Sequence, residues 1–197
     1  MALPPTTKGD LRRLLRARRR QLVASRDLAD DDAAIAAHLD ALPPGACPRS
    51  APATVLSYES LPHEPPTAAI NTALRSRGHR VLVPITLPDM QLDWCDLDDP
   101  GRTPFGIEAP AGADLVLAPG LAVDTAGTRM GQGGGCYDRV LPMLPRETPV
   151  IVLLHPGEHT SEPLPREAHD IAVPWVLTAD GCTPSHRLLG STTPPAG

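Results

Sequence analysis

The fold is decided by residues 115–144, which read LVLAPGLAVDTAGTRMGQGGGCYDRVLPML. The apolar run Leu115–Ala118 predicts a buried strand, and residues 135–144 predict a helix. The loop between them is rich in glycine, at Gly131, Gly133, Gly134 and Gly135. We call residues 131–135 the glycine loop. Because glycine adopts positive φ angles and lets the backbone approach a ligand closely, this strand–loop–helix order predicts an α/β protein with a phosphate site at the loop.

Charged residues flank the glycine loop. Arg129 and Arg139 can donate paired hydrogen bonds to an anion, and Asp138 can hold a cation. The predicted helix would point the positive end of its dipole at the same anion. The loop fits neither common nucleotide motif, because a P-loop lysine is missing and Cys136 stands where the dinucleotide fingerprint needs glycine. A tight strand-to-helix turn without a ligand therefore stays open.

Two N-terminal helices are predicted, at residues 7–24 and 27–42. Leucines lie on one face of the first helix, and its other face carries Arg12, Arg13, Arg16, Arg19 and Arg20. We expect this basic face to be solvated. A net charge of −5 argues against a surface that binds nucleic acid.

The rest of the chain alternates strands and helices. The predicted strands are residues 54–57, 80–84, 91–95, 115–118, 150–154 and 172–177, and the helices are 67–77 and 135–144. Apolar strands without alternation predict a mainly parallel sheet covered on both faces. The expected fold is a single-domain, three-layer α/β sandwich of Rossmann-like type with N-terminal helices. Because ligands bind beyond the carboxyl ends of such strands, residues 58–67, 119–138 and 155–170 should lie along one edge.

Length and composition predict one compact domain over residues 1–190, followed by a disordered tail at residues 191–197. Aromatic residues make up only 3% of the chain, which predicts an aliphatic core. The four cysteines form no C-x-x-C pair, and no apolar run approaches the roughly 18 residues of a membrane helix. We therefore expect a cytoplasmic monomer with reduced thiols, which binds small molecules and neither nucleic acid nor membranes.

Residues 118–141, APGLAVDTAGTRMGQGGGCYDRVL, resemble the signature of the 5-formyltetrahydrofolate cyclo-ligases, also called 5,10-methenyltetrahydrofolate synthetases. Three further segments match that family in order along the chain. Lys8–Arg12 resembles its opening K-x-x-L-R, Tyr58–Thr67 resembles its Y-x-S-x-x-x-E-x-x-T, and Pro165–Thr178 resembles its closing P-x-E-x-H-D…V-x-T segment. The resemblance therefore spans almost the whole chain.

The resemblance implies a ligase of one-carbon folate metabolism. Such an enzyme converts 5-formyltetrahydrofolate to 5,10-methenyltetrahydrofolate, with ATP as co-substrate, Mg²⁺ as cofactor, and ADP and phosphate as products. A formamide oxygen is a poor leaving group, so the γ-phosphoryl of ATP is moved onto it. N10 then attacks the activated carbon, and phosphate departs. In phosphoryl transfer the protein mainly positions the reacting groups and neutralises the charge of the phosphates.

The resemblance also implies roles for single residues. The ATP-binding residues would be Lys8, Arg12, Arg129, Gly131, Gln132, Gly133, Gly134, Gly135, Cys136 and Tyr137. The catalytic residues would be Arg129, Tyr137 and Arg139, and the Mg²⁺ ligands would be Asp138 and Asp170. The folate contacts would be Glu64, Gln132, Gly134 and Cys136. The Glu64 carboxylate suits the amino-pyrimidine edge of the pterin.

Four positions depart from the family pattern. Gln132 stands where the family often has an aromatic or basic residue, and Cys136 stands where it often has a second aromatic residue. Gly134 stands where many members carry lysine, and Ala109 replaces a glutamate. The departures therefore concern the predicted folate contacts and the rate more than the ATP site. Two alternatives stay open, a catalytically weakened relative that senses folate or phosphate and a sugar-phosphate enzyme of similar architecture. The intact predicted ATP and Mg²⁺ ligands favour the enzyme over the sensor, and Glu64 favours folate over sugar phosphate.

Overall fold

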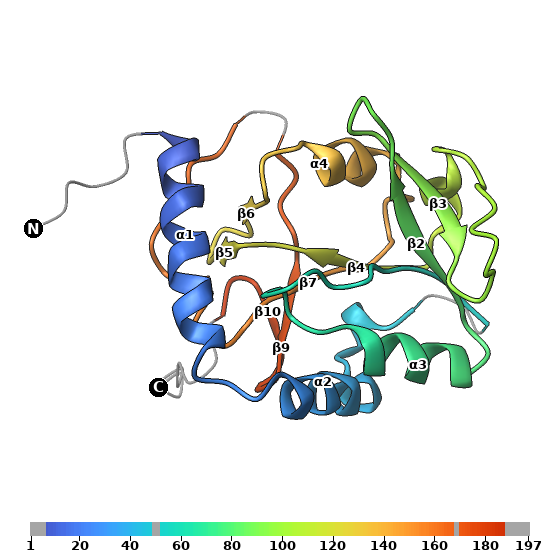
Figure 1. The fold of residues 1–197 in the computed structure, drawn as a ribbon, viewed down its shortest axis with the longest axis horizontal. Coiled ribbons are helices and arrows are strands. Elements are labelled where there is room, and N and C mark those ends of the chain that lie inside the picture. Colours follow the sequence, from blue (N-terminus) through green and yellow to red (C-terminus); the bar gives the residue numbers. More distant parts are fainter. Residues whose placement is uncertain (1–6, 49–51, 168–169, 188–197) are drawn as a thin grey trace, which may run out of the picture.

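A seven-stranded sheet forms the centre of the molecule (Figure 1). The computed structural model describes residues 7–48, 52–167 and 170–187, so the tail predicted at residues 191–197 lies outside the described residues. The strand order is β10-β9-β7-β4-β1-β2-β3. The strands are β1 Thr54–Leu56, β2 Arg80–Thr86, β3 Leu92–Asp96, β4 Leu115–Pro119, β7 Val150–Leu153, β9 Trp175–Thr178 and β10 Gly181–Pro184.

The sheet is mainly parallel, as the apolar strands predicted. β1 pairs in parallel with β2 and β4, and β7 pairs in parallel with β4 and β9. The two edge strands run antiparallel to their neighbours, β3 to β2 and β10 to β9. Every residue of β7 is buried. Strands that are covered on both faces need no polar alternation, which explains the continuous apolar runs of the central strands.

Helices cover both faces of the sheet and complete the three-layer sandwich (Figure 1). α2 (Leu28–Ala37) and α3 (Ala68–Ser76) lie on one face, and α4 (Cys136–Val140) lies on the other. α1 (Lys8–Val23) crosses one end of the sheet, and the Thr7 side chain caps it by accepting from the Asp10 N–H at 3.1 Å. Within the described residues, no helix is long and apolar enough to cross a membrane.

The sheet divides the core in two. The core is mostly aliphatic, but Tyr58, Trp94 and Tyr137 also belong to it, so the prediction of an aliphatic core is only partly right. Ile35, Ile70 and Leu74 from α2 and α3 pack in one cluster with Leu117 of β4. Val116, the residue before Leu117, belongs to the cluster on the opposite face. Successive side chains of a strand point to opposite faces, so a single strand supplies both clusters.

A second, three-stranded sheet was not predicted. Its strands are β5 Ala122–Asp124, β6 Arg129–Met130 and β8 His159–Thr160, in the order β6-β5-β8. Strands of two or three residues leave no periodicity in the sequence. α1 packs on this sheet through Leu11 and Leu15.

Three predicted elements are clearly shorter than expected. The helix predicted at residues 27–42 ends at Ala37 and continues as a 3₁₀ turn, His38–Ala41. The strand predicted at residues 172–177 begins only at Trp175, because the Val173 N–H donates to the Gly127 carbonyl and Pro174 has no N–H to donate. The helix predicted at residues 135–144 ends at Val140 and continues as a 3₁₀ turn that contains Pro142.

Replacing Leu117 by alanine should destabilise the protein strongly. Leu117 is fully buried at the centre of the sheet, and its truncation leaves a cavity that costs about 2–5 kcal/mol of unfolding free energy. Leu14 on α1 is 55% exposed, so Leu14→Ala should change the same free energy by less than about 0.5 kcal/mol. Urea denaturation of the two variants measures the difference, and equal losses would contradict the assigned core.

Candidate active site

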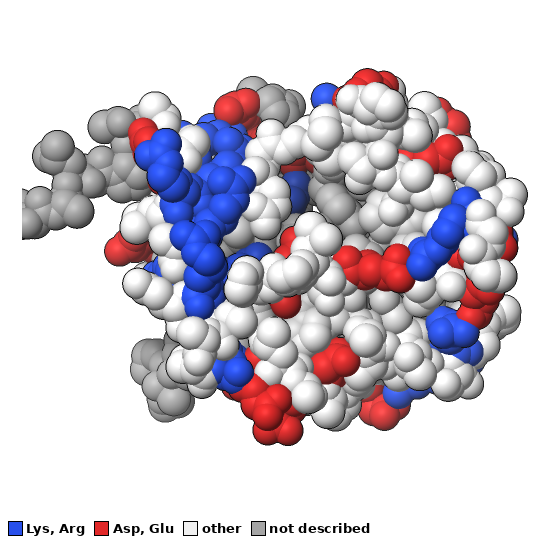
Figure 2. All heavy atoms as spheres, in the orientation of Figure 1, with Lys and Arg blue, Asp and Glu red and all other residues white. Residues whose placement is uncertain are grey.

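A cavity of about 430 Å³ opens at the carboxyl edge of the main sheet. Its walls come from α1, the segment after β1, the β2–β3 hairpin, the end of β4 and the glycine loop. The surface is hollowed beside the basic face of α1 (Figure 2). The predicted edge is confirmed for residues 58–67 and 119–138, whereas no described residue of 155–170 lines this cavity.

The glycine loop forms one wall of the cavity. Gly133 and Gly135 take φ angles of 110° and 69°, so these two positions require glycine. Gly135 is also the N-cap of α4, without a side-chain hydrogen bond to cap the helix. Because α4 spans only five residues, the predicted helix dipole adds little, and the backbone N–H groups of the loop are the anion donors on offer.

Arginines of α1 hold the glycine loop against the helix. Arg12 Nε donates to the Gly131 carbonyl at 3.1 Å, and Arg16 Nε donates to the Gln132 side-chain oxygen at 2.9 Å. The predicted solvated face is therefore wrong for Arg19, which is buried, and incomplete for Arg12 and Arg16. The covering loop lies 119 residues from Arg12 along the chain, so no local pattern could reveal it.

Arg129 brings a buried positive charge to the cavity wall. Its side chain is 5% exposed, pairs with the Asp138 carboxylate, and donates from Nη1 to the Pro119 carbonyl at 3.2 Å. The guanidinium also lies over the Tyr137 ring, 5.7 Å from its centroid. Arg129 Nε has no hydrogen-bond partner among the described residues. A buried guanidinium with an unused donor favours an anion at this wall.

Lys8 and Asp170 contact each other, and neither lines the cavity. Lys8 Nζ lies 3.0 Å from Asp170 Oδ2 and 2.9 Å from Glu167 Oε1. Desolvation by itself would lower the pKa of Lys8, but the hydrogen bonds to the two carboxylates outweigh it and raise that pKa. The two predicted metal ligands thus pair with different side chains, Asp138 with Arg129 and Asp170 with Lys8. Across the described ranges, no group of three or more His, Cys, Asp or Glu is placed to hold a metal.

Glu64 and two tyrosines line another part of the cavity. Glu64 is buried, and its Oε2 accepts from the Leu61 N–H at 3.0 Å. The hydroxyls of Tyr58 and Tyr137 are buried and have no partner in the part of the chain that the structure describes. Burial raises the pKa of both tyrosines, so both remain neutral hydroxyls at pH 7. The sequence assigned no role to Tyr58, which appeared there only as the first residue of the segment 58–67.

The tip of the β2–β3 hairpin packs on the glycine loop. Arg139 Nη1 donates to the Met90 carbonyl at 3.0 Å and to the Gly134 carbonyl at 3.4 Å. Arg139 does not line the cavity, so its position gives the predicted catalytic role no direct support. The predicted folate contacts Gln132, Gly134 and Cys136 all line it. A Cβ at Gly134 would overlap Cε of Met90, so a side chain there would need the end of the flexible, 40% exposed Met90 side chain to move aside.

His155 supports the residue that precedes Glu64. Its side chain is 1% exposed, and its Nε2 lies 3.1 Å from the His63 carbonyl oxygen. His159 makes a similar contact elsewhere, with Nε2 2.7 Å from the Ser185 carbonyl oxygen. Burial lowers the pKa of both histidines below the ordinary 6.5, so both rings are neutral at pH 7.

The fold and the cavity define an α/β protein with a small-molecule site that offers anion donors and a buried carboxylate. The sequence profile of the 5-formyltetrahydrofolate cyclo-ligase family matches residues 5–179. A 5-formyltetrahydrofolate cyclo-ligase from Mycolicibacterium smegmatis is 34% identical over 143 residues, which cover 64% of this chain and 73% of the relative. The chain therefore belongs to the 5-formyltetrahydrofolate cyclo-ligase family, a family of ATP-dependent ligases.

Solved structures agree with the fold. A 5,10-methenyltetrahydrofolate synthetase from Mycoplasma pneumoniae superposes with a TM-score of 0.69 at 19% identity, over 88% of this chain and 99% of that chain. A 5,10-methenyltetrahydrofolate synthetase from Aquifex aeolicus superposes with a TM-score of 0.66 at 18% identity, over 94% of this chain and 96% of that chain. At these identities the likeness establishes the shared α/β architecture.

Stability should fall as the pH drops below about 6.5, the ordinary pKa of histidine. His155 and His159 bind protons near that value in the unfolded chain, whereas the folded protein holds them neutral to lower pH. The unfolded chain therefore carries more protons between the lowered pKa and 6.5, so the free energy of unfolding decreases as the pH falls through this window. Urea denaturation at a series of pH values measures the slope.

A His155→Gln variant is the control for this pH dependence. Glutamine cannot titrate but can still donate to the His63 carbonyl. The variant should lose less unfolding free energy than the parent as the pH falls. Identical slopes in the two proteins would show that His155 does not contribute.

Proposed function

We propose that the protein converts 5-formyltetrahydrofolate to 5,10-methenyltetrahydrofolate with ATP, the reaction of its family, and that different parts of the cavity bind the two substrates. The observation that carries the proposal is that Arg12, Arg129 and the glycine loop line the same cavity as Glu64. The cavity thus offers positive charge and backbone N–H groups for phosphates together with a carboxylate for a pterin. Both substrates need one cavity because a phosphoryl group passes directly between them.

The arginine and glycine wall holds the ATP phosphates. Arg12 reaches the wall from α1, and Arg129 carries an Nε without a partner among the described residues. Lys8 lies one helical turn before Arg12 on the same face of α1. It pairs with Glu167 and Asp170 outside the cavity, and we assign it to the ATP phosphates as a residue that contacts them from outside the cavity wall. Guanidinium groups match phosphate oxygens with two parallel donors, which favours arginine for this task.

The buried carboxylate holds the folate. Glu64 uses one oxygen for the Leu61 N–H, so the carboxylate stays oriented while it accepts from the amino-pyrimidine edge of the pterin. Gln132, Gly134 and Cys136 contact the same substrate from the loop. The neutral Tyr137 hydroxyl donates a hydrogen bond to the formyl oxygen, because it is buried and has no other partner in the described structure.

Asp138 is the residue that we assign to Mg²⁺, with Asp170 as a second ligand. Proteins hold Mg²⁺ through one or two carboxylates together with substrate phosphates, and Asp138 lines the cavity with a 38% exposed side chain. Asp138 therefore fits the ion when ATP supplies the other oxygens, whereas Asp170 lies outside the cavity and would have to leave Lys8 to reach the ion. When bound, the ion neutralises charge on the transferring phosphoryl group.

The chain itself then has three tasks during the reaction. It aligns the γ-phosphoryl group with the formyl oxygen, it keeps N10 close to the activated carbon, and it holds the phosphate that leaves when N10 closes the ring. Arg12, Arg129 and the glycine loop neutralise the phosphate throughout, since their donors are fixed before the reaction begins. The presence of Lys8, Arg12 and Asp138 favours this enzyme over a catalytically weakened sensor.

We also keep the proposals that the protein acts as a cytoplasmic monomer and binds no nucleic acid. The net charge of −5 supports the last of these. Size-exclusion chromatography with light scattering tests the oligomeric state.

Arg12→Ala should weaken ATP binding. Loss of a charged hydrogen-bond donor should raise the KM for ATP about tenfold or more. Arg13 is the matched control, because its side chain is 79% exposed and pairs with Asp10 outside the cavity. Arg13→Ala should change that KM by less than about twofold. The absorbance of methenyltetrahydrofolate follows both reactions, and equal KM values in the two variants would remove Arg12 from the ATP site.

Asp138→Asn should lower turnover by about 10²-fold, the scale for loss of one preorganised electrostatic group. The substitution keeps the volume of the side chain and removes its charge, so more Mg²⁺ should be needed for half-maximal rate. Asp40, which is 81% exposed and pairs with Arg77, provides the control variant Asp40→Asn. Turnover at the parental rate in Asp138→Asn would remove Asp138 from the Mg²⁺ site, whereas a parent without ATP-dependent turnover would favour the sensor over the enzyme.

A further inference from the structure

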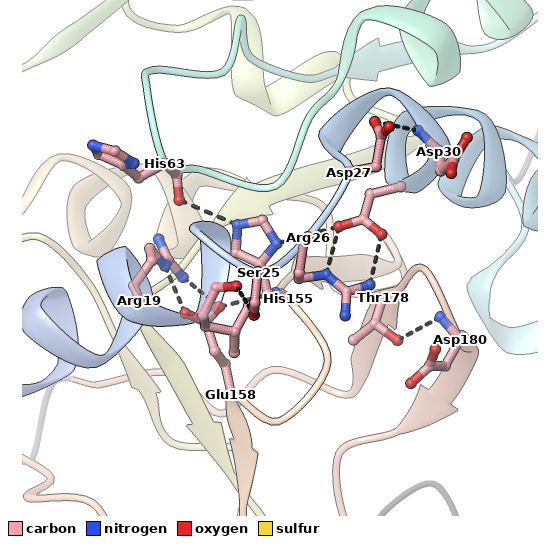
Figure 3. A network of polar contacts seen from close by, with 12 residues as sticks. Arg19, Ser25, Arg26, Asp27, Asp30, His63, His155, Glu158, Thr178 and Asp180 are labelled. Atoms are coloured by element: carbon pink, nitrogen blue, oxygen red, sulfur yellow. Dashed lines mark hydrogen bonds and ion pairs between the residues drawn. The ribbon is translucent and has the colours of Figure 1, made fainter.

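A buried ion pair joins α1 to the segment after β7 (Figure 3). Arg19 Nε lies 2.6 Å from Glu158 Oε1, and Arg19 Nη2 lies 2.6 Å from Glu158 Oε2. The two side chains are only 4% and 5% exposed. Arg19 Nη2 also donates to the carbonyl of Gly120, the residue that leads into β5. The pair therefore fixes α1 relative to the chain that continues to the glycine loop.

The same ion pair holds His155. Glu158 Oε2 accepts from the His155 N–H at 2.9 Å, and the buried His155 ring then faces the turn that contains His63 (Figure 3). His155 Nε2 lies 3.1 Å from the His63 carbonyl oxygen. Since a carbonyl oxygen only accepts, Nε2 carries the hydrogen and donates it. On the other side of the ring, Nδ1 lies 3.9 Å from Asp31 Oδ2, an oxygen that Arg26 also contacts.

The turn that His155 holds carries Glu64. His63 has a φ angle of 71°, a conformation that non-glycine residues adopt rarely and only when surrounding contacts hold it. The His63 side chain is exposed, so the backbone contact with His155 is the described interaction that holds this residue. The turn is closed locally by the Glu64 N–H, which donates to the Leu61 carbonyl at 3.0 Å, and by the Leu61 N–H, which donates to Glu64 Oε2; the His155 ring, which does not line the cavity, ties this turn to the rest of the protein.

We propose that His155 is a positioning residue for the folate: through the His63 carbonyl it fixes the turn that presents Glu64 to the cavity, and the Arg19–Glu158 pair anchors His155 in the same frame as α1. The proposal rests on the assignment of Glu64 to the pterin. A role in stability alone would affect both substrates equally, whereas a role in placing Glu64 affects folate and spares ATP.

Two polar substitutions of His155 separate these roles. The amide nitrogen of glutamine can take the place of Nε2, whereas asparagine is too short to reach the His63 carbonyl. His155→Asn should raise the KM for 5-formyltetrahydrofolate about tenfold, the effect of one misplaced charged hydrogen bond, and leave the KM for ATP within about twofold. His155→Gln should restore the parental folate KM.

His159 supplies the matched control. Its Nε2 contacts the Ser185 carbonyl at 2.7 Å, and neither residue lines the cavity. His159→Asn removes the same kind of hydrogen bond, so it should lower the melting temperature without changing either KM. Parallel rises of both KM values in His155→Asn, or a lower melting temperature with unchanged KM values, would overturn the proposal. A tenfold rise of the folate KM in folded His155→Gln would do the same, even if His155→Asn does not fold.

A double variant distinguishes failure of this proposal from failure of the assigned function. If His155 acts through Glu64, Glu64→Gln combined with His155→Asn should have the folate KM of Glu64→Gln alone. Additive rises of the folate KM would show that His155 acts by another route. If Glu64→Gln itself leaves the folate KM unchanged, the pterin assignment is wrong, independently of His155.

Discussion

A charged pair hidden from water joins α1 to the rest of the protein. Arg19 and Glu158 are both almost fully buried, and a lone buried charge of either kind would be strongly unfavourable. The docking of α1 and the structure of the segment after β7 therefore depend on each other. Because Arg12 and Arg16 lie on the same helix, their contacts with the glycine loop also depend on this pair. This interaction outside the cavity thus acts together with the packing of Leu11 and Leu15 to place the cavity wall.

An acidic protein can hold phosphate because charge acts locally. The net charge is −5, yet Arg12 and Arg129 both line the cavity, together with the carboxylates of Glu59, Glu64 and Asp138, and Asp138 is the one that pairs with Arg129 among the described residues. The low-dielectric surroundings of a buried guanidinium strengthen its interaction with an anion. The distant acidic residues are screened by solvent and salt, so they weaken that interaction little.

The sequence predicted what depends on neighbouring residues. The apolar runs of β4 and β7 are long enough to identify a parallel sheet, and the glycine loop and Glu64 lie in compact motifs. Arg19 and His155 could not be assigned, because their partners Glu158 and His63 lie 139 and 92 residues away. The short strands β5, β6 and β8 were missed for a related reason, since they are defined by pairing and carry no pattern of their own.

Gly134, one of the departures from the family pattern, lies against another part of the chain. The hairpin tip places Cε of Met90 where a side chain at position 134 would begin, and Arg139 fixes the Met90 carbonyl to the loop. A lysine at this position would need the Met90 side chain to move aside, so the absent lysine and the position of Met90 are compatible with each other. The positive charge that lines the cavity then belongs to arginines, Arg12 and Arg129. Because a guanidinium does not deprotonate in proteins, this cavity keeps its anion donors charged at alkaline pH, where a lysine in the same place would lose its proton.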